Sequence, residues 1–127
     1  MVIVAHPDDI EFGAAGTCAK WARRGARIVY VITTSGNGGT HDPQYTRETI
    51  ASLREEEQRA AALVCGVHEV EFLRENDGEV MPTLDLRKKY VALIRKHKPE
   101  IVVGMDPTMM FSGDGYINHP DHRAAGQ

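Results

Sequence analysis

Residues 2–9 read Val-Ile-Val-Ala-His-Pro-Asp-Asp, an apolar run that passes directly into a polar turn. The four residues of the run carry no polar side chain, which is typical of a strand buried on both faces of a parallel sheet. Pro7 disfavours helical backbone at His6, so we expect the strand to end there. The same succession, a buried strand followed by polar and titratable side chains, recurs along the chain and indicates an α/β fold.

Three more segments are predicted to be strands. Residues 28–32 and 101–104 are short apolar runs like the first, so they are also expected inside the sheet. Residues 67–73 alternate apolar and polar side chains, which is typical of an edge or half-exposed strand. The chain therefore carries four strand segments, separated by stretches long enough for helices.

Between these strands, apolar residues recur at three- and four-residue steps, which predicts helices over residues 12–24, 46–65 and 84–98. Phe12 opens the apolar stripe of the first helix. Each helix is followed by a residue that favours its end: Gly25, Gly66 and Pro99. Residues 120–127 are expected to open a further helix. Alternating strands and helices predict right-handed βαβ crossovers, and therefore a Rossmann-like, doubly wound and mostly parallel sheet with helices on both faces.

Composition and length limit the class of protein. The 127 residues suit one domain, and their 42% hydrophobic and 26% charged content is ordinary for a globular protein. The net charge of −3 argues against nucleic-acid binding, and no apolar run reaches the ~20 residues of a membrane span. Two cysteines and no signal peptide favour a cytoplasmic location. We treat residues 1–127 as a single α/β domain, and expect it to be the N-terminal part of a longer one.

The carboxyl ends of parallel strands form the ligand-binding edge of such a sheet. The first strand leads into residues 6–9, the second into residues 34–39, the third into residues 75–78, and the fourth into a segment that ends at residues 119–122. Four of the six histidines are therefore expected at one edge: His6, His41, His119 and His122. Two His/Asp clusters at the same edge are hard to explain as chance.

The two clusters predict a metal site. His6 and Asp9 are three residues apart across a turn, and the adjacent carboxylates of Asp8 and Asp9 repel each other unless a cation lies beside them. Imidazole and carboxylate groups are suitable ligands for zinc, and a His/Asp/His set leaves one position for water. Each motif alone has a simpler interpretation, Asp-Asp as a helix N-cap and His-x-x-His as two surface residues. Their joint position on one sheet edge favours the metal.

Further motifs extend the pattern over nearly the whole chain. They are residues 4–11 with Gly13 and Gly16, residues 33–36, Arg54-x-x-Glu57, residues 72–73 with Asp77-Gly78, and residues 118–124. In this order, the sequence resembles the PIG-L/LmbE-like family of zinc-dependent N-acetylglucosaminyl deacetylases. The resemblance implies an α/β fold and removal of the N-acetyl group from an N-acetylglucosamine-type substrate by a zinc-activated water.

The resemblance also implies roles for individual residues. His6, Asp9 and His122 would hold one zinc ion per chain, for which Fe²⁺ or Co²⁺ could substitute. Asp8 would be the general base that takes a proton from the water, and His119 would be a positively charged partner that stabilises the oxyanion. Zinc lowers the pKa of its water to about 7, so a neighbouring carboxylate can complete the deprotonation.

Substrate and supporting contacts are implied in the same way. Arg54 would reach hydroxyl groups or an anionic aglycone of the small amino-sugar substrate, and Asp77 would bind sugar hydroxyls. A solvated charge and a turn are the simpler interpretations of these two residues. Asp121 would orient His119 or His122 by a hydrogen bond without touching the metal, or else cap a helix.

Other positions and functions are left as alternatives. Some family members carry a tyrosine two residues before the first histidine of the second motif, and here that position is Ile117. Residues 109–111 could line a substrate groove, form a homo-oligomer contact or pack beneath their loop. His68 and His97 are interpreted as surface residues, and neither cysteine is expected near the site. The rival functions are an amidase acting on a larger thiol-conjugate amide, a phosphate-ester hydrolase, and a non-catalytic, metal-containing sugar-binding module.

Overall fold

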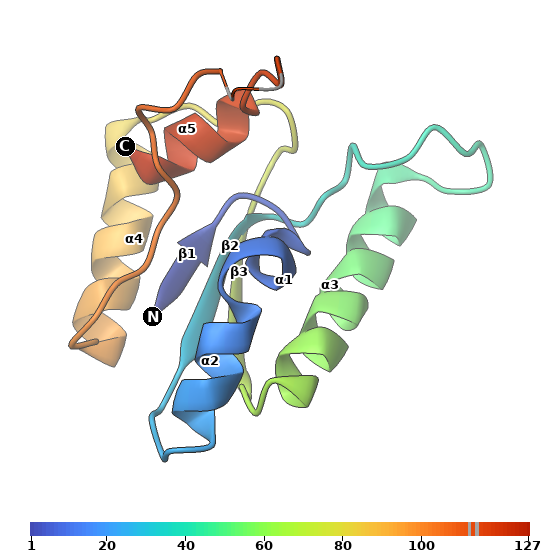
Figure 1. The fold of residues 1–127 in the computed structure, drawn as a ribbon. Coiled ribbons are helices and arrows are strands. Elements are labelled where there is room, and N and C mark those ends of the chain that lie inside the picture. The colour runs from blue at the N-terminus through green and yellow to red at the C-terminus, as the bar shows by residue number, and fades with distance from the viewer. Residues whose placement is uncertain (112, 114) are drawn as a thin grey trace.

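Three parallel strands form the sheet at the centre of the protein (Figure 1). The computed structural model describes residues 1–111, 113 and 115–127. The strands lie in the order β1 (Val2–Val4), β2 (Val29–Thr34) and β3 (Glu69–Glu75). Both pairs are parallel, with Ile3 opposite Val31 and Tyr30 opposite Val70. The central strand β2 is buried along its whole length, whereas β3 is half-buried, as predicted for an edge strand.

The fourth predicted strand is reduced to a single bridge. Val103 pairs with Val2 in an isolated parallel bridge, and the backbone N–H of Ile3 donates to the carbonyl oxygen of Val103 at 2.9 Å. Ile101 and Val102 are exposed, so the predicted buried strand is wrong. The segment contacts β1 on one side, and among the described residues no further strand pairs with its other side.

Helices in the described part of the chain are α1 (Asp9–Gly13), α2 (Ala15–Ala22), α3 (Arg47–Val64), α4 (Leu84–His97) and α5 (Pro120–Gly126). The single helix predicted over residues 12–24 is instead two helices, separated at Ala14. Phe12 is 90% exposed because the buried residue of α1 is Ile10, and residues two apart on a helix point in different directions. No helix in these described regions is both long and apolar enough to cross a membrane.

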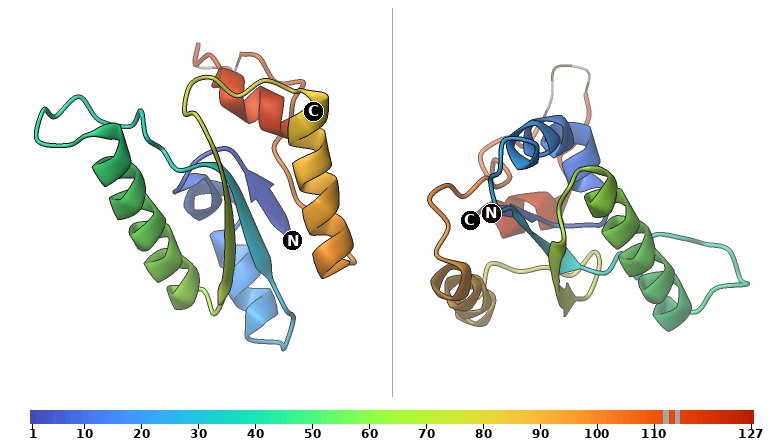
Figure 2. Two further views of the ribbon diagram at one scale, coloured as in Figure 1. Left: turned by 180° about the vertical axis from the view of Figure 1, so that it is seen from behind. Right: turned by 90° about the horizontal axis from the view of Figure 1, so that it is seen from below.

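Helices cover both faces of the sheet, which confirms the doubly wound α/β prediction (Figure 2). Alternate residues of a strand point to opposite faces. On one face, Ile32 belongs to an apolar cluster with Cys18 of α2 and Ala62 of α3. On the other face, Val31 packs in a cluster with Tyr90 of α4. The sheet therefore lies between two helical layers, with β1 and β2 buried and β3 half-buried.

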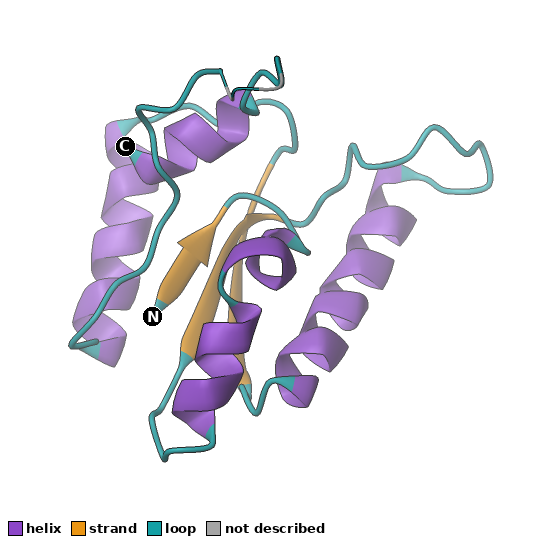
Figure 3. Cartoon of the chain, viewed as in Figure 1, coloured by secondary structure: helices purple, strands orange, loops and turns teal. Residues whose placement is uncertain are grey.

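The loops that follow the strands leave the sheet at one end, and α5 lies beside that end (Figure 3). His6 follows β1, residues 35–39 follow β2, and residues 76–78 follow β3. Thr46 starts α3 with a reciprocal capping box, in which its side chain accepts from the Thr49 backbone N–H. The topology thus brings the polar segments of the sequence to a common edge.

Candidate metal centre and catalytic pocket

The structure brings His6, Asp9 and His122 together at this edge, although His122 is 116 residues from His6 in the sequence. His6 Nδ1 lies 3.2 Å from His122 Nε2, and His122 Nε2 lies 3.1 Å from Asp9 Oδ1. His6 Nδ1 and Asp9 Oδ2 are 3.5 Å apart. The three side chains come from the turn after β1, the first turn of α1 and helix α5, so the fold itself assembles the group.

The donor set fits a small divalent cation. Tetrahedral zinc has bonds of about 2.0–2.1 Å to nitrogen and oxygen, which places ligand atoms about 3.3 Å from one another. His6 Nδ1 and His122 Nε2 are 3.2 Å apart, and the nearest Asp9 oxygens lie 3.1 Å from His122 (Oδ1) and 3.5 Å from His6 (Oδ2), which is close to this spacing. Two imidazoles and one carboxylate suit zinc, iron(II) and cobalt(II) alike. The described residues could therefore hold one metal ion and leave a position for a further ligand.

The second ring nitrogen of His6, Nε2, contacts two carboxylates, and these contacts fix the orientation of the imidazole ring. His6 Nε2 lies 3.1 Å from Asp77 Oδ1 and 3.2 Å from Asp121 Oδ2. While Nε2–H donates toward these carboxylates, a metal ion at Nδ1 could replace the proton that Nδ1 otherwise shares with Asp9. Asp77, which is predicted to bind sugar hydroxyls, also contacts His6, and the sequence did not indicate this contact.

Asp121 is fully buried and anchors the loop after β3 to helix α5. Its carboxylate accepts hydrogen bonds from the backbone N–H groups of Gly78 at 2.7 Å and Val80 at 3.2 Å. The carboxylate turns toward His6 and this loop, and one of its oxygens lies within 4.8 Å of a ring nitrogen of His119, so its predicted role in orienting His119 stays a prediction. The predicted cap is different: His119 caps α5, with Nδ1 accepting from the Asp121 backbone N–H at 3.2 Å.

Electrostatics at the centre favour a cation surrounded by carboxylates. Burial opposes a charged His6, but hydrogen bonds to Asp77 and Asp9 outweigh it and raise the pKa of His6 to about 10. Burial also opposes a charged Asp9, yet hydrogen bonds from His122 and His6 lower its pKa. The hydrogen bond with His6 lowers the pKa of Asp77. Both carboxylates are thus kept ionised around a point that attracts positive charge.

His119 lies beside the His6, Asp9, His122 group and, with His6 and Asp121, belongs to a second set of donor atoms that lie within 4.8 Å of one another. Its ring centroid is 4.7 Å from that of His6, in an edge-to-face arrangement. Burial, followed by repulsion from His6, lowers the pKa of His119, which opposes the predicted positive charge. Because Nδ1 accepts the backbone hydrogen bond in α5, the neutral ring carries its proton on Nε2 and can still act as a donor.

Asp8 presents an exposed carboxylate next to this centre. Its side chain is 58% exposed, and Asp8 Oδ2 accepts a hydrogen bond from Arg54 Nη2 at 2.8 Å. Arg54 Nη2 also donates to the carbonyl oxygen of Pro7 at 2.8 Å. Asp8 occupies the N-cap of α1, but its side chain makes no capping hydrogen bond. The carboxylate is therefore available for chemistry instead of being used to start the helix.

The predicted catalytic and substrate residues share one open pocket of about 370 Å³. It is lined by His6, Asp8, Gly38, Gly39, Arg54, Asp77, Gly78 and His119. The loop after β2, which contains Gly36, Gly38 and Gly39, packs closely against the Arg54 side chain. A Cβ on Gly36, whose φ is +64°, would lie 2.9 Å from Arg54 Cδ. His41 lies outside this pocket, in an exposed part of the loop after β2.

Sequence reasoning missed two supporting residues. Asn118 Oδ1 lies 3.2 Å from His122 Nδ1, which is the ring nitrogen on the side away from His6. Gln58 is buried and accepts a hydrogen bond from the Asp8 backbone N–H. Gln58 stands four positions from Arg54 on α3, and this helical spacing is the signal that could have found it. Asn118 precedes α5, and its place in the motif at residues 118–124 is the signal there.

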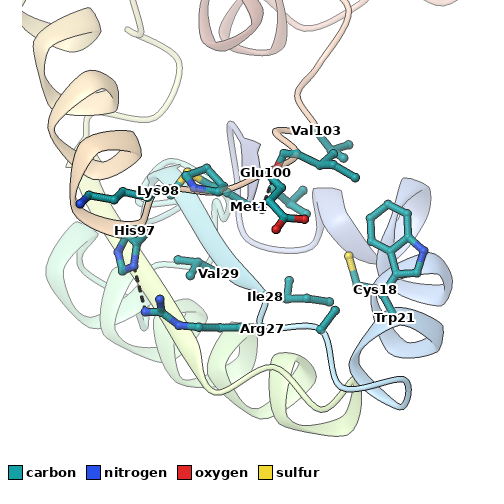
Figure 4. Close-up of a pocket in the computed structure, with 14 residues that line it drawn as sticks. Met1, Cys18, Trp21, Arg27, Ile28, Val29, His97, Lys98, Glu100 and Val103 are labelled. Carbon is teal, nitrogen blue, oxygen red and sulfur yellow. Dashed lines mark hydrogen bonds between the residues drawn. The ribbon is translucent and has the colours of Figure 1, made fainter.

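A larger pocket lies at the opposite end of the sheet and is not the candidate site. It has a volume of about 550 Å³ and is lined mainly by Met1, Trp21, Ile28 and other side chains near the amino ends of the strands (Figure 4). The smaller pocket is chemically favoured because it contains the imidazole and carboxylate donors at the carboxyl ends of the strands. Near the larger pocket, His97 is only 4% exposed at its side chain, so its interpretation as a surface residue is wrong.

The remaining predicted positions are placed as follows. His68 is exposed, as expected. Cys18 and Cys65 are free thiols, and both pack in or against the apolar cluster under α2 and α3, away from the pocket. Met109, Met110 and Phe111 are about half exposed or more, so they do not pack fully beneath their loop.

Comparison with known proteins agrees with this arrangement. A diacetylchitobiose deacetylase of Thermococcus kodakarensis is 37% identical over 126 residues, which are 99% of this chain and 45% of that protein. The structure of an N,N'-diacetylchitobiose deacetylase from Pyrococcus horikoshii matches with a TM-score of 0.91 at 33% identity, over 98% of this chain and 45% of that one. GalB, a 4-carboxy-2-hydroxymuconate hydratase from Pseudomonas putida KT2440, matches with a TM-score of 0.80 at 26% identity, over 98% and 50% of the two chains.

The chain thus spans about half the length of these relatives. Its sequence matches the family described as GlcNAc-PI de-N-acetylase (PIG-L) over residues 1–127, the whole of the chain. The parallel sheet, the His/Asp group at its carboxyl edge and the family match point the same way. The chain belongs to the PIG-L family of deacetylases.

Proposed function

We propose that this chain forms the catalytic N-terminal part of a zinc-dependent N-deacetylase acting on an N-acetylglucosamine-type amino sugar. The observation that carries the proposal is the convergence of His6, Asp9 and His122 beside a pocket that also exposes Asp8 and His119. Two of the relatives described above are named as deacetylases of diacetylchitobiose, an N-acetylated sugar. Metal donors, an exposed carboxylate and a hydrogen-bond donor are the groups that metal-assisted amide hydrolysis uses.

His6, Asp9 and His122 would hold the metal, with Asp77 and Asp121 orienting the His6 ring through Nε2. A zinc ion there would supply Lewis acidity, polarising a carbonyl and activating water near neutral pH. The backbone N–H of His6 donates to Asp9 Oδ2 at 2.7 Å and holds that carboxylate in place. The ligand geometry is therefore set by the protein before a substrate arrives.

Asp8 is proposed as the general base. Its carboxylate faces the pocket and is held by a hydrogen bond from Arg54, so it can take the proton from the attacking water. His119 lines the same pocket and carries a donor at Nε2 when neutral. It is proposed to donate a hydrogen bond to the carbonyl oxygen as negative charge develops there.

Arg54 and Asp77 are proposed to contact the amino sugar. Both line the pocket, and a guanidinium with several donors suits sugar hydroxyls or an anionic aglycone. Asp77 is already shared between His6 Nε2 and the Gly38 backbone N–H, so its role in binding would be combined with a role in orienting His6.

The test is release of acetate from N-acetylglucosamine and diacetylchitobiose by the metal-loaded protein. The Asp8→Asn variant should retain the metal and lose about 10²–10⁴-fold in kcat, because the base is lost while the ligands remain. A series of longer N-acyl groups distinguishes deacetylation from the amidase alternative. Metal-loaded protein that releases no acid from any of these amides would overturn the proposal.

A second candidate activity is addition of water to a carbon–carbon double bond. The match to the hydratase GalB, at 26% identity and a TM-score of 0.80, favours considering it. The deacetylase structure is more similar, at 33% identity and a TM-score of 0.91, so deacetylation is preferred. Loss of the ultraviolet absorbance of an unsaturated dicarboxylate, without acetate release from sugars, would reverse this preference.

A further inference from the structure

The backbone of Asp8 adopts an unusual conformation. Its φ of 87° and ψ of −21° lie in the left-handed region, which few residues other than glycine occupy. Aspartate tolerates this region better than most residues, but the surrounding structure must still hold it there. The consequence is visible in the side chain, which turns away from the start of α1 and contacts Arg54.

Gln58 holds this turn from the side of α3. The backbone N–H of Asp8 donates to Gln58 Oε1 at 2.7 Å, and Gln58 Nε2 donates to Glu11 Oε1 at 3.1 Å. Gln58 is only 2% exposed. Burying an amide is unfavourable unless its polar atoms are hydrogen-bonded, and here both ends have partners on the same turn and helix. The side chain is thereby fixed in one orientation.

The position of Gln58 on α3 links it to Arg54. Residues four apart lie on the same face of a helix. The inner face of α3 therefore carries a row at four-residue steps, made of Ile50, Arg54, Gln58 and Ala62. The two apolar members lie at its ends, and the two polar members both contact the turn after β1. Arg54 contacts the Asp8 carboxylate, while Gln58 contacts the Asp8 backbone.

We infer that Gln58 is a positioning residue for Asp8: its amide oxygen fixes the turn that directs the Asp8 carboxylate into the pocket. The inference rests on the proposed function, in which Asp8 is the general base. Gln58 does not line the pocket, so its effect on the reaction must pass through Asp8. Asp9 is held separately by His6 and His122, and metal binding should therefore be unaffected when Gln58 is changed.

The Gln58→Met variant tests the inference, because methionine has nearly the same length and lacks the oxygen acceptor. We expect unchanged metal content, a kcat lower by about 10–100-fold and a KM within about twofold of the original. Hydrogen exchange of the Asp8 amide should be faster by about tenfold or more, because its acceptor is gone. Glu56→Met, on the exposed side of the same helix, is the matched control and should change none of these quantities.

A reversed pair provides the rescue. In the double variant Glu11→Gln/Gln58→Glu, the carboxylate at position 58 can accept from the Asp8 N–H and from the new amide at position 11. Both hydrogen bonds are thereby restored, and donor and acceptor are exchanged only in the bond between positions 58 and 11. We expect Asp8 amide exchange and kcat to return to within about threefold of the original values.

Asp8 amide exchange that is unchanged in Gln58→Met overturns the inference, whatever the activity. Faster exchange with undiminished kcat in an active enzyme also overturns it, because the turn would then not direct the base. Failure of the unmodified protein to hydrolyse any N-acetylated sugar is a failure of the proposed function. In that case, the exchange rate and the Cα chemical shift of Asp8 in the two variants still decide whether Gln58 sets the turn.

Discussion

Replacing Asp121 by alanine is expected to lower the free energy of unfolding by about 2–4 kcal/mol. Asp121 is fully buried, and its carboxylate is the acceptor for two backbone N–H groups of the loop after β3. It also contacts His6 Nε2 at 3.2 Å. One side chain thus connects α5, this loop and the candidate metal centre.

The magnitude follows from the groups that would be left behind. Val80 is buried, so its N–H would lose its acceptor without gaining water, at a cost of about 1–3 kcal/mol. Gly78 is exposed and its N–H can be rehydrated, so losing this hydrogen bond costs about 0.5–1.5 kcal/mol. Loss of a group that supports a metal ligand typically lowers metal affinity by roughly 10–100-fold. Because His6 retains its contact with Asp77, we expect a loss of only about tenfold here.

The assay is urea unfolding of metal-free protein, followed by the fluorescence of Trp21, the one tryptophan. Asp121→Asn is the control: it keeps one carbonyl oxygen that can accept from Val80, so we expect about half the destabilisation of the alanine variant. A loss below about 1 kcal/mol in Asp121→Ala would refute the reasoning, since it would mean that the two backbone N–H groups do not depend on this carboxylate.

Two further perturbations test other parts of the structure. Gly36→Ala should destabilise the fold by more than the ~1–2 kcal/mol expected from left-handed backbone alone, because the new Cβ meets Arg54. Gly25→Ala is the control: its φ is +88° and no atom lies within 4 Å of the new Cβ, so it should lose only the free energy that left-handed backbone costs. Equal losses of unfolding free energy in the two variants would contradict this reasoning. The hydrogen bond from Arg74 lowers the pKa of Glu55, so this pair stabilises the fold above about pH 4.3 and its contribution is lost as the pH falls. Glu55→Gln should therefore flatten the fall of Tm between about pH 5 and 3, and an unchanged slope would count against the pair.

Much of the fold could be predicted because buried strands and amphipathic helices leave clear local patterns. The presence of helix α3 and the edge position of β3 follow from such patterns. Residues 101–104 show the limit: an apolar run indicates burial, but it does not reveal how many neighbouring strands pair with it. Phe12 was misplaced because periodicity does not locate the break at Ala14, which turns α1 away from the line of α2.

The candidate site was predictable where sequence neighbours share a motif, and unpredictable where contacts depend on tertiary structure. The motifs at residues 6–9 and 119–122 placed the donor residues, and the sheet topology joined them. The direction of the Asp121 carboxylate, toward His6 and the loop after β3, depends on how α5 packs against that loop. Gln58 was missed for the same reason: nothing local shows that its amide meets the backbone of a turn 50 residues earlier.

Metal content is the most direct test of the central claim that His6, Asp9 and His122 form one metal centre. Elemental analysis of tag-free protein should find about one equivalent of zinc per chain after zinc is supplied and excess is removed. The His122→Ala variant should lose most of it, whereas His68→Ala, at an exposed histidine far from the pocket, should keep it. Well-folded protein that binds no metal, or a His122→Ala variant that binds as much as the original, would contradict the account.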